Sequence, residues 1–208
     1  MAVNGWTMKV IQLLLEEFDG RAKFGQFKRR LYQEYLVKGG IARVLDRLYD
    51  SNRFLVFEKY EQVKYVSVAW EDAIICCGYR KRGWDTCLFG HDLENEANWN
   101  VSDNLGLSSF SAEQIRTIIF RSHPVVCVNY NTGGCDDDDC PDLHVCSRFI
   151  LQKCTAGARC NFGHSFRTTE HNQWILETFY VEDLNDEELK RRVLVTNISN
   201  TDISHDPK

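Results

Sequence analysis

Hydrophobic residues in the first third of the chain recur at the spacing of three amphipathic helices followed by two short strands. Gly20 and the pair Gly39 and Gly40 separate three apolar stripes of helical period. The stripes are Met8, Ile11, Leu14, Leu15 and Phe18; Phe24, Phe27, Leu31 and Tyr35; and Ile41, Val44, Leu45 and Leu48. Two strand-like runs, 54–57 and 63–70, follow across a polar stretch that suits a hairpin turn. This order predicts an α+β chain that begins with a winged-helix-like domain.

The pattern changes after the predicted hairpin, because cysteines appear, glycines become frequent and the helical period is interrupted. We expect small zinc fingers and connecting helices there. The expected domains are a winged-helix-like domain at 1–72, a degenerate CCCH finger plus helix at 73–124, tandem CCCH zinc fingers at 125–168, a C-terminal helical segment at 169–196 and a flexible tail at 197–208.

A finger-like segment followed by a helix occurs twice. Residues 87–91 precede a predicted helix at 111–120, and residues 160–164 precede one at 185–194. Each helix begins with a capping box, Ser111 with Gln114 and Asn185 with Glu188. The apolar faces of these helices are expected to pack on the fingers or on the N-terminal domain.

Two consecutive sets of three cysteines and one histidine give the strongest chemical signal. The sets are Cys127, Cys135, Cys140 and His144, and Cys146, Cys154, Cys160 and His164. Buried free thiols beside surface histidines are the alternative, but the same order repeats with one intervening residue. Three thiolates and one imidazole complete a tetrahedral shell, so two structural Zn²⁺ sites without an open catalytic position are predicted.

A third, incomplete set lies upstream. Cys87 and His91 reproduce the end of each complete finger, and Cys77 is the third candidate ligand. Cys76 is a possible fourth, although adjacent cysteines fit one tetrahedral ion poorly. Weak zinc binding and a metal-free remnant both remain open. The surrounding cluster, Arg80, Lys81, Arg82, Trp84 and Phe89, combines basic and aromatic side chains.

The formal net charge of −5 argues against a uniformly basic nucleic-acid binder and requires a local basic patch. Residues 136–139 are four aspartates between ligands of the first complete set; they lack the glycine and terminal glutamate of a calcium loop and indicate solvated charge. The second set is basic, and aromatic residues lie between its basic ones at Phe149, Phe162 and Phe166. We expect these aromatic side chains to be exposed. The predicted contacts of this set with single-stranded RNA are Arg148, Lys153, Arg159, Phe162 and Arg167.

These features together resemble the N-terminal CCCH zinc-finger region of the zinc-finger antiviral protein and of the CCCH-finger-bearing poly(ADP-ribose) polymerase family. The resemblance rests on the helical start, the finger pairs, the stretch 105–124 before Cys127, and 168–172. It implies a cytoplasmic RNA-binding region with four fingers in two pairs, acting in antiviral defence, innate immunity or RNA turnover. Gly78 and Leu88 differ from the family's CpG pocket, and only the aromatic Phe89 is kept, so CpG selectivity is not implied.

The sequence therefore predicts a zinc-dependent RNA-binding module with single-stranded RNA, and RNA-decay or antiviral proteins, as partners. A protein-interaction scaffold that has lost RNA binding is the alternative, motivated by the acidic charge. We expect no enzyme, since neither a Ser/His/Asp arrangement, a phosphate loop nor an open metal site can be assembled, and no small-molecule substrate. No signal peptide or membrane-spanning run is evident, so a cytoplasmic protein without membrane contact is expected.

Overall fold

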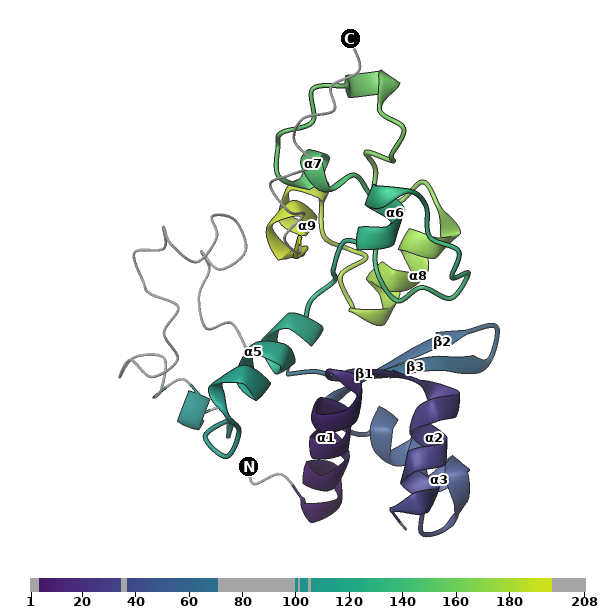
Figure 1. Cartoon of the computed structure of the whole chain (residues 1–208), viewed down its shortest axis with the longest axis vertical. Coiled ribbons are helices and arrows are strands. Elements are labelled where there is room, and N and C mark those ends of the chain that lie inside the picture. Colours follow the sequence, from purple (N-terminus) through teal and green to yellow (C-terminus); the bar gives the residue numbers. More distant parts are fainter. Residues whose placement is uncertain (1–3, 35–36, 71–99, 101, 105, 196–208) are drawn as a thin grey trace. The chain divides into compact units, whose positions relative to one another are not determined.

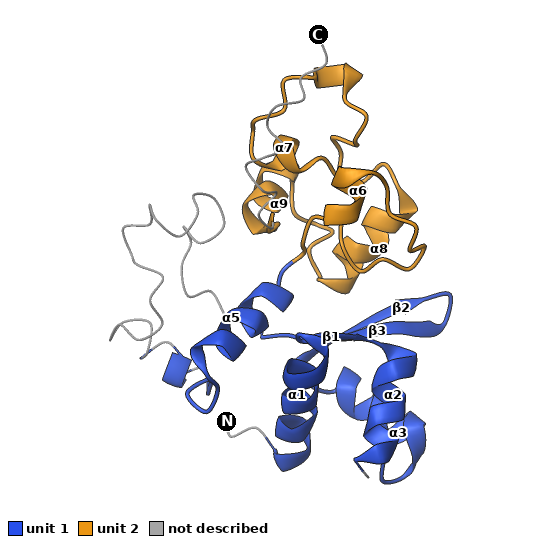
Figure 2. Cartoon of the chain, viewed as in Figure 1, with its two compact units in different colours: residues 1–123 blue, residues 124–208 orange. Residues whose placement is uncertain are grey.

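The computed structural model describes residues 4–34, 37–70, 100, 102–104 and 106–195. The chain divides into two compact units, unit 1 at 1–123 and unit 2 at 124–208 (Figure 2), and each is considered by itself. The incomplete finger at 76–91 and the predicted tail at 197–208 lie outside the described residues. The finer five-part division stays a prediction.

Unit 1 is a mixed α+β unit in which helices accompany a small antiparallel sheet of strand order β1-β3-β2. Its described elements in chain order (Figure 1) are α1 Gly5–Phe18, β1 Arg21–Lys23, α2 Phe24–Gln33, α3 Gly40–Tyr49, β2 Phe54–Lys59, β3 Gln62–Val68 and α5 Ala112–Arg121. The three helices and the hairpin occur where they are predicted. Strand β1 was not predicted, because three residues are too few to show an alternating pattern.

The core of unit 1 contains the predicted apolar stripes. Members of the stripes of α1, α2 and α3 are fully or almost fully buried: Ile11, Leu14, Phe27, Leu31, Val44 and Leu48. Tyr35 lies outside the described residues. Ile115, Ile118 and Ile119 of α5 join this core, and Ser122 Oγ accepts a hydrogen bond of 2.8 Å from the Trp70 N–H. Of the two expected packing sites, α5 therefore uses the N-terminal domain.

Gly20 ends the α1 turn at a point where no side chain fits. Its φ of +78° lies in the left-handed region, and an added Cβ would lie 2.9 Å from Thr117 Cγ2 and 3.2 Å from Val68 Cγ2. The glycine thus lets α1 turn into β1 while α5 packs closely over the turn.

Unit 2 contains little regular secondary structure. Its described elements are α6 Val128–Thr132, α7 Ser147–Ile150, the 3-10 turn η2 Gly157–Arg159, α8 Glu170–Thr178 and α9 Asp186–Arg192. Both predicted capping boxes are present: Ser111 with Gln114 begins α5 of unit 1, and Asn185 with Glu188 begins α9 of unit 2. The second repeat helix ends at Arg192 rather than at Leu194, because Leu194 leaves the helix and forms a parallel bridge with Val125.

None of the described helices has the length and apolar character needed to cross a membrane.

Candidate zinc centres and nucleic-acid surface

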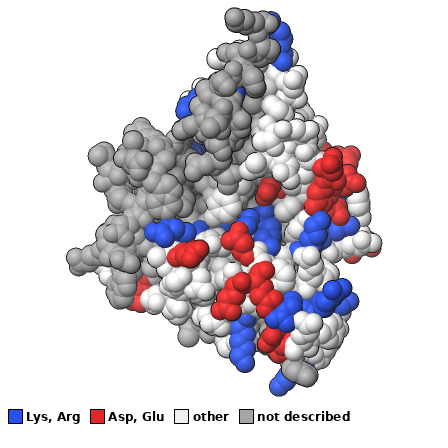
Figure 3. Space-filling view, viewed as in Figure 1, with Lys and Arg blue, Asp and Glu red and all other residues white. Residues whose placement is uncertain are grey.

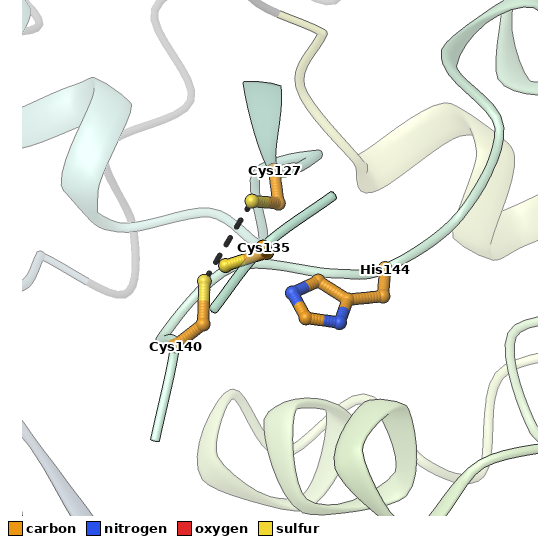
Figure 4. Close-up of side chains that lie close together, drawn as sticks. All are labelled: Cys127, Cys135, Cys140 and His144. Atoms are coloured by element: carbon orange, nitrogen blue, oxygen red, sulfur yellow. Dashed lines mark hydrogen bonds between the residues drawn. The ribbon is translucent and has the colours of Figure 1, made fainter. Parts of the chain in front are cut away.

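The four predicted ligands of the first complete finger, here called finger one (residues 127–144), come together. Their ligand atoms all lie within 4.8 Å of one another. Figure 4 shows the three thiols and the His144 ring directed toward a common centre. Cys127 Sγ lies 3.7 Å from Cys140 Sγ, too far for a disulfide bond of about 2.0 Å. A tetrahedron with Zn–S bonds of about 2.3 Å has edges of about 3.8 Å.

The second complete finger, called finger two (residues 146–164), repeats this arrangement. Its four ligand atoms also lie within 4.8 Å of one another, and Cys146 Sγ is 3.8 Å from Cys160 Sγ. Two independent clusters therefore have the sulfur spacing of a tetrahedral zinc site.

The histidine side chains supply a further test of whether a metal ion fits. Nε2 of His144 and Nε2 of His164 are buried and have no hydrogen-bond partner among the described residues. A buried polar atom without a partner is costly, and a metal ion would satisfy it. Each cluster is therefore able to bind a zinc ion, as the sequence predicts. The suggested third site at Cys76, Cys77, Cys87 and His91 lies outside the described residues.

A backbone amide supports the first cysteine ligand of finger one. The Tyr130 N–H donates a 3.4 Å hydrogen bond to the Cys127 sulfur. Such a donor stabilises negative charge on sulfur and orients the ligand. In finger two, the Phe149 N–H donates instead to the Cys146 carbonyl at 3.1 Å.

The Cys127 and Cys140 thiols also interact directly. A hydrogen bond from Cys140 lowers the pKa of Cys127 below its usual value, and the same contact raises the pKa of Cys140. The contact therefore favours the thiolate form at Cys127, which is the form in which cysteine binds zinc.

An aromatic ring three residues after the first cysteine stacks on the ligand histidine in each finger. The Tyr130 ring lies 4.7 Å from the His144 ring at an interplanar angle of 6°, and Phe149 lies 4.8 Å from His164 at 10°. Phe149 thus covers one face of the ligand histidine at this zinc site. Tyr130 was missed by the sequence reasoning, although its equivalent spacing to Phe149 is a readable signal.

Helix α8 fixes the last ligand of finger one. The fully buried Asn172 accepts a 2.8 Å hydrogen bond from the His144 N–H and donates a 3.1 Å bond to the His144 carbonyl. The His171 ring stacks 4.0 Å from the His144 ring, which therefore lies between His171 and Tyr130. These two residues belong to the stretch 168–172, whose role the sequence alone did not reveal.

Side chains of α6 join the two fingers. Tyr130 Oη accepts a 3.1 Å hydrogen bond from the Gly163 N–H. Asn131 donates to the Val145 carbonyl at 2.9 Å and accepts from the Ser147 N–H at 2.8 Å. Fingers one and two consequently form one packed body rather than two independent beads.

Replacing Tyr130 with phenylalanine is expected to lower the free energy of unfolding of unit 2 by about 1–3 kcal/mol, because the Gly163 N–H loses its partner while the ring stack remains. Thermal unfolding of the zinc-loaded chain measures this. Tyr180→Phe is the matched control, since Tyr180 is 78% exposed, and should leave the transition unchanged. An unaltered transition in Tyr130→Phe would contradict the assigned bridge.

The predicted RNA contacts of finger two occupy different environments. Arg148, Lys153 and Arg159 are exposed, and Phe162 is partly exposed with its ring 5.6 Å from that of Tyr130. Arg167 instead pairs with Asp186 and donates to the Leu184 carbonyl. The cluster Arg80, Lys81, Arg82, Trp84 and Phe89 lies outside the described residues.

The interpretation of Phe166 as an exposed aromatic was wrong. Its side chain is completely buried and its ring lies 6.4 Å from that of Phe149. Phe149 is partly exposed, but Lys190 Nζ lies 4.5 Å from its centroid in addition to the His164 stack. Small fingers need apolar cover for the metal site; Phe149 supplies it at His164, and Phe166 lies beside Phe149 in the interior. Phe162 is left as the aromatic candidate for stacking within finger two.

The two fingers carry opposite charge. Finger one contains five aspartates and no lysine or arginine, whereas finger two contains Arg148, Lys153 and Arg159 and no acidic residue. A zinc ion with three thiolates contributes one negative charge, so the loaded fingers carry −6 and +2. Figure 3 shows acidic side chains gathered on one face of unit 2 and basic ones near its tip. Phosphate is therefore repelled by finger one and attracted by finger two.

Comparison with known proteins gives partial relatives. Mouse and human Protein mono-ADP-ribosyltransferase PARP12 are each 26% identical over 104 and 105 residues, which are 45% and 46% of this chain. Mouse Zinc finger CCCH-type antiviral protein 1 is 27% identical over 88 residues, or 38% of this chain. No protein-family model matches the chain.

These matches confirm, for part of the chain, the resemblance that the sequence suggested. They span only 14%, 15% and 9% of the lengths of the mouse PARP12, human PARP12 and mouse antiviral relatives. The two clusters of three cysteines and one histidine agree with the CCCH-type zinc finger in the name of the antiviral relative. Because so little of each relative is matched, the matches do not assign the activity of the whole relative to this chain.

Proposed function

We propose that this chain is a non-catalytic, zinc-dependent module that binds single-stranded RNA across finger two. The observation that carries the proposal is the basic surface of that finger, in which exposed Arg148, Lys153 and Arg159 accompany the partly exposed Phe162. Basic side chains attract the phosphates of a strand, and an aromatic face accepts an unpaired base. A duplex presents no free base face, so the arrangement favours single strands.

Zinc would act through structure in this function. Both clusters supply four ligands, which leaves no coordination position for substrate or water. When bound, the metal fixes the short α7 and η2 segments that present the basic side chains. Finger one, with its acidic loop, supports finger two through Tyr130 and Asn131.

Unit 1 is proposed to be winged-helix-like. The order α1, β1, α2, α3, β2, β3 and the sheet order β1-β3-β2 support this assignment. Residues 71–99 are proposed to add an incomplete finger, with Cys77, Cys87 and His91 as zinc ligands and its basic and aromatic side chains as further RNA contacts.

The biological setting is proposed from the relatives. One relative is named as an antiviral protein, which supports a role in antiviral defence or cytoplasmic RNA turnover with protein partners from those processes. The five aspartates of finger one favour a second candidate, a protein-interaction scaffold without RNA affinity.

Titration of the zinc-loaded chain into a labelled single-stranded RNA pool distinguishes the two candidates. The RNA module predicts saturable binding that weakens as salt rises, with a log–log slope of about −0.7 for each phosphate contact. A duplex of the same sequence is the control and should bind less tightly. Absence of binding to every single strand at low salt would exclude the RNA module and favour the scaffold.

A further inference from the structure

The two clusters contain the same ligand types but differ in access. Cys127 and Cys140 of finger one are 3% and 6% exposed, and Cys135 alone among its thiols is partly exposed. In finger two only Cys146 is similarly buried, while Cys154 and Cys160 are partly exposed. The segment between the latter two, 155–159, is exposed throughout. A chelator therefore reaches two sulfur atoms of finger two more readily than the buried pair of finger one.

The ligand histidines differ in support as well. His144 is held at both its N–H and its carbonyl by Asn172, and its ring is stacked by Tyr130 and His171. The His164 ring is stacked by Phe149, and within the described part of the chain no hydrogen bond reaches the N–H or carbonyl of His164. Helix α8 begins at Glu170, and its first turn contacts finger one through His171 and Asn172.

We propose that Asn172 and His171 are positioning residues for the first zinc site, and that they make finger one the retained site and finger two the exchangeable one. Loss of a metal ion requires the ligands to detach in turn, and an imidazole fixed by two backbone bonds and two rings returns to the ion rather than leaving. Partners of this kind commonly change metal affinity by about 10–100-fold. This inference rests on the proposed function: the supply of zinc would regulate RNA binding by finger two while finger one stays folded.

Zinc release from the full chain into excess chelator tests the order. Two amide NMR signals report the two sites separately from any zinc held elsewhere: that of Tyr130, whose N–H donates to the Cys127 sulfur, and that of Phe149, whose ring stacks on His164. The expected result is that the Phe149 signal is lost at least about tenfold faster than the Tyr130 signal. Equal rates, or earlier loss at Tyr130, would overturn the assignment.

Variants of Asn172 test the positioning role. Asn172→Ala should accelerate release at Tyr130 by about 10–100-fold and leave release at Phe149 unchanged. Asn172→Asp keeps the acceptor for the His144 N–H but loses the donor, so its rate should fall between those of the wild type and the alanine variant. A rate in Asn172→Ala that equals the wild-type rate would refute the role.

A general loss of stability is separated by Val193→Ala, which removes buried packing from the same unit at a residue only 1% exposed. This control should not accelerate release at Tyr130; equal acceleration would mean that Asn172 acts only on overall stability.

The last experiment is an RNA titration after partial zinc removal. Intact RNA binding with finger two empty would refute the regulatory step, whereas no binding by the loaded wild type would refute the proposed function and leave the release order standing.

Discussion

Replacing Cys127 with serine should unfold finger one and release its zinc ion while unit 1 keeps its structure. Structural zinc supplies about 10–16 kcal/mol in small fingers, which is comparable to the whole stability of a typical domain, about 5–15 kcal/mol. Unit 2 has few regular elements with which to offset such a loss. Hydrogen exchange of the full chain, read peptide by peptide, should show fast exchange at 125–145 and unchanged protection of β2 and β3.

Two controls define this result. Val128→Ala changes the neighbouring residue, whose side chain is 43% exposed and contributes no ligand, and should retain full zinc content and protection. Chelation of the wild type should reproduce the Cys127→Ser exchange pattern in finger one. Retained protection at 125–145 in a zinc-free chain would show that packing alone maintains the finger, contrary to our account.

Removing the basic side chains of finger two should produce the largest loss of RNA binding. We expect the triple variant Arg148→Ala, Lys153→Ala and Arg159→Ala to reduce the magnitude of the log–log salt slope by about 2, at about 0.7 for each lost phosphate contact. Affinity at low salt should fall accordingly. Fluorescence anisotropy over a salt series measures both quantities, and zinc content should remain unchanged because none of the three residues is a ligand.

The matched control removes the same charge from unit 1. Lys28, Arg29 and Lys38 are exposed, and replacing all three with alanine also lowers the net charge by three. This variant should bind RNA nearly as the wild type does. Equal losses in the two triple variants would mean that overall charge, rather than the surface of finger two, governs binding.

The zinc clusters were predictable because ligand chemistry leaves a direct record in sequence. Three thiols and an imidazole in fixed order specify a tetrahedral site wherever the chain brings them together. The helical stripes were predictable for a similar reason, since a period of 3.6 residues identifies the buried side of α1 and α3. Capping boxes at Ser111 and Asn185 add local signals that need no tertiary context.

Other features depend on contacts between distant residues and could not be read locally. Asn172 reaches the His144 backbone across 28 positions, and an asparagine near a helix start ordinarily suggests only a cap. Phe166 was placed on the surface because basic neighbours surround it, but its ring fills the interior of unit 2. The ion pair of Arg167 with Asp186 could not be read from the sequence, and its contact with RNA stays a prediction. Local charge patterns do not reveal such partners.

Ultraviolet crosslinking of single-stranded RNA to the zinc-loaded full chain, followed by identification of the crosslinked peptides, tests the central claim most directly. Our account predicts crosslinks within residues 145–168, at or beside Phe162, and their loss in the Arg148, Lys153 and Arg159 triple variant. A chain that binds RNA but carries its crosslinks entirely outside 145–168 would contradict the claim that finger two is the RNA-binding surface.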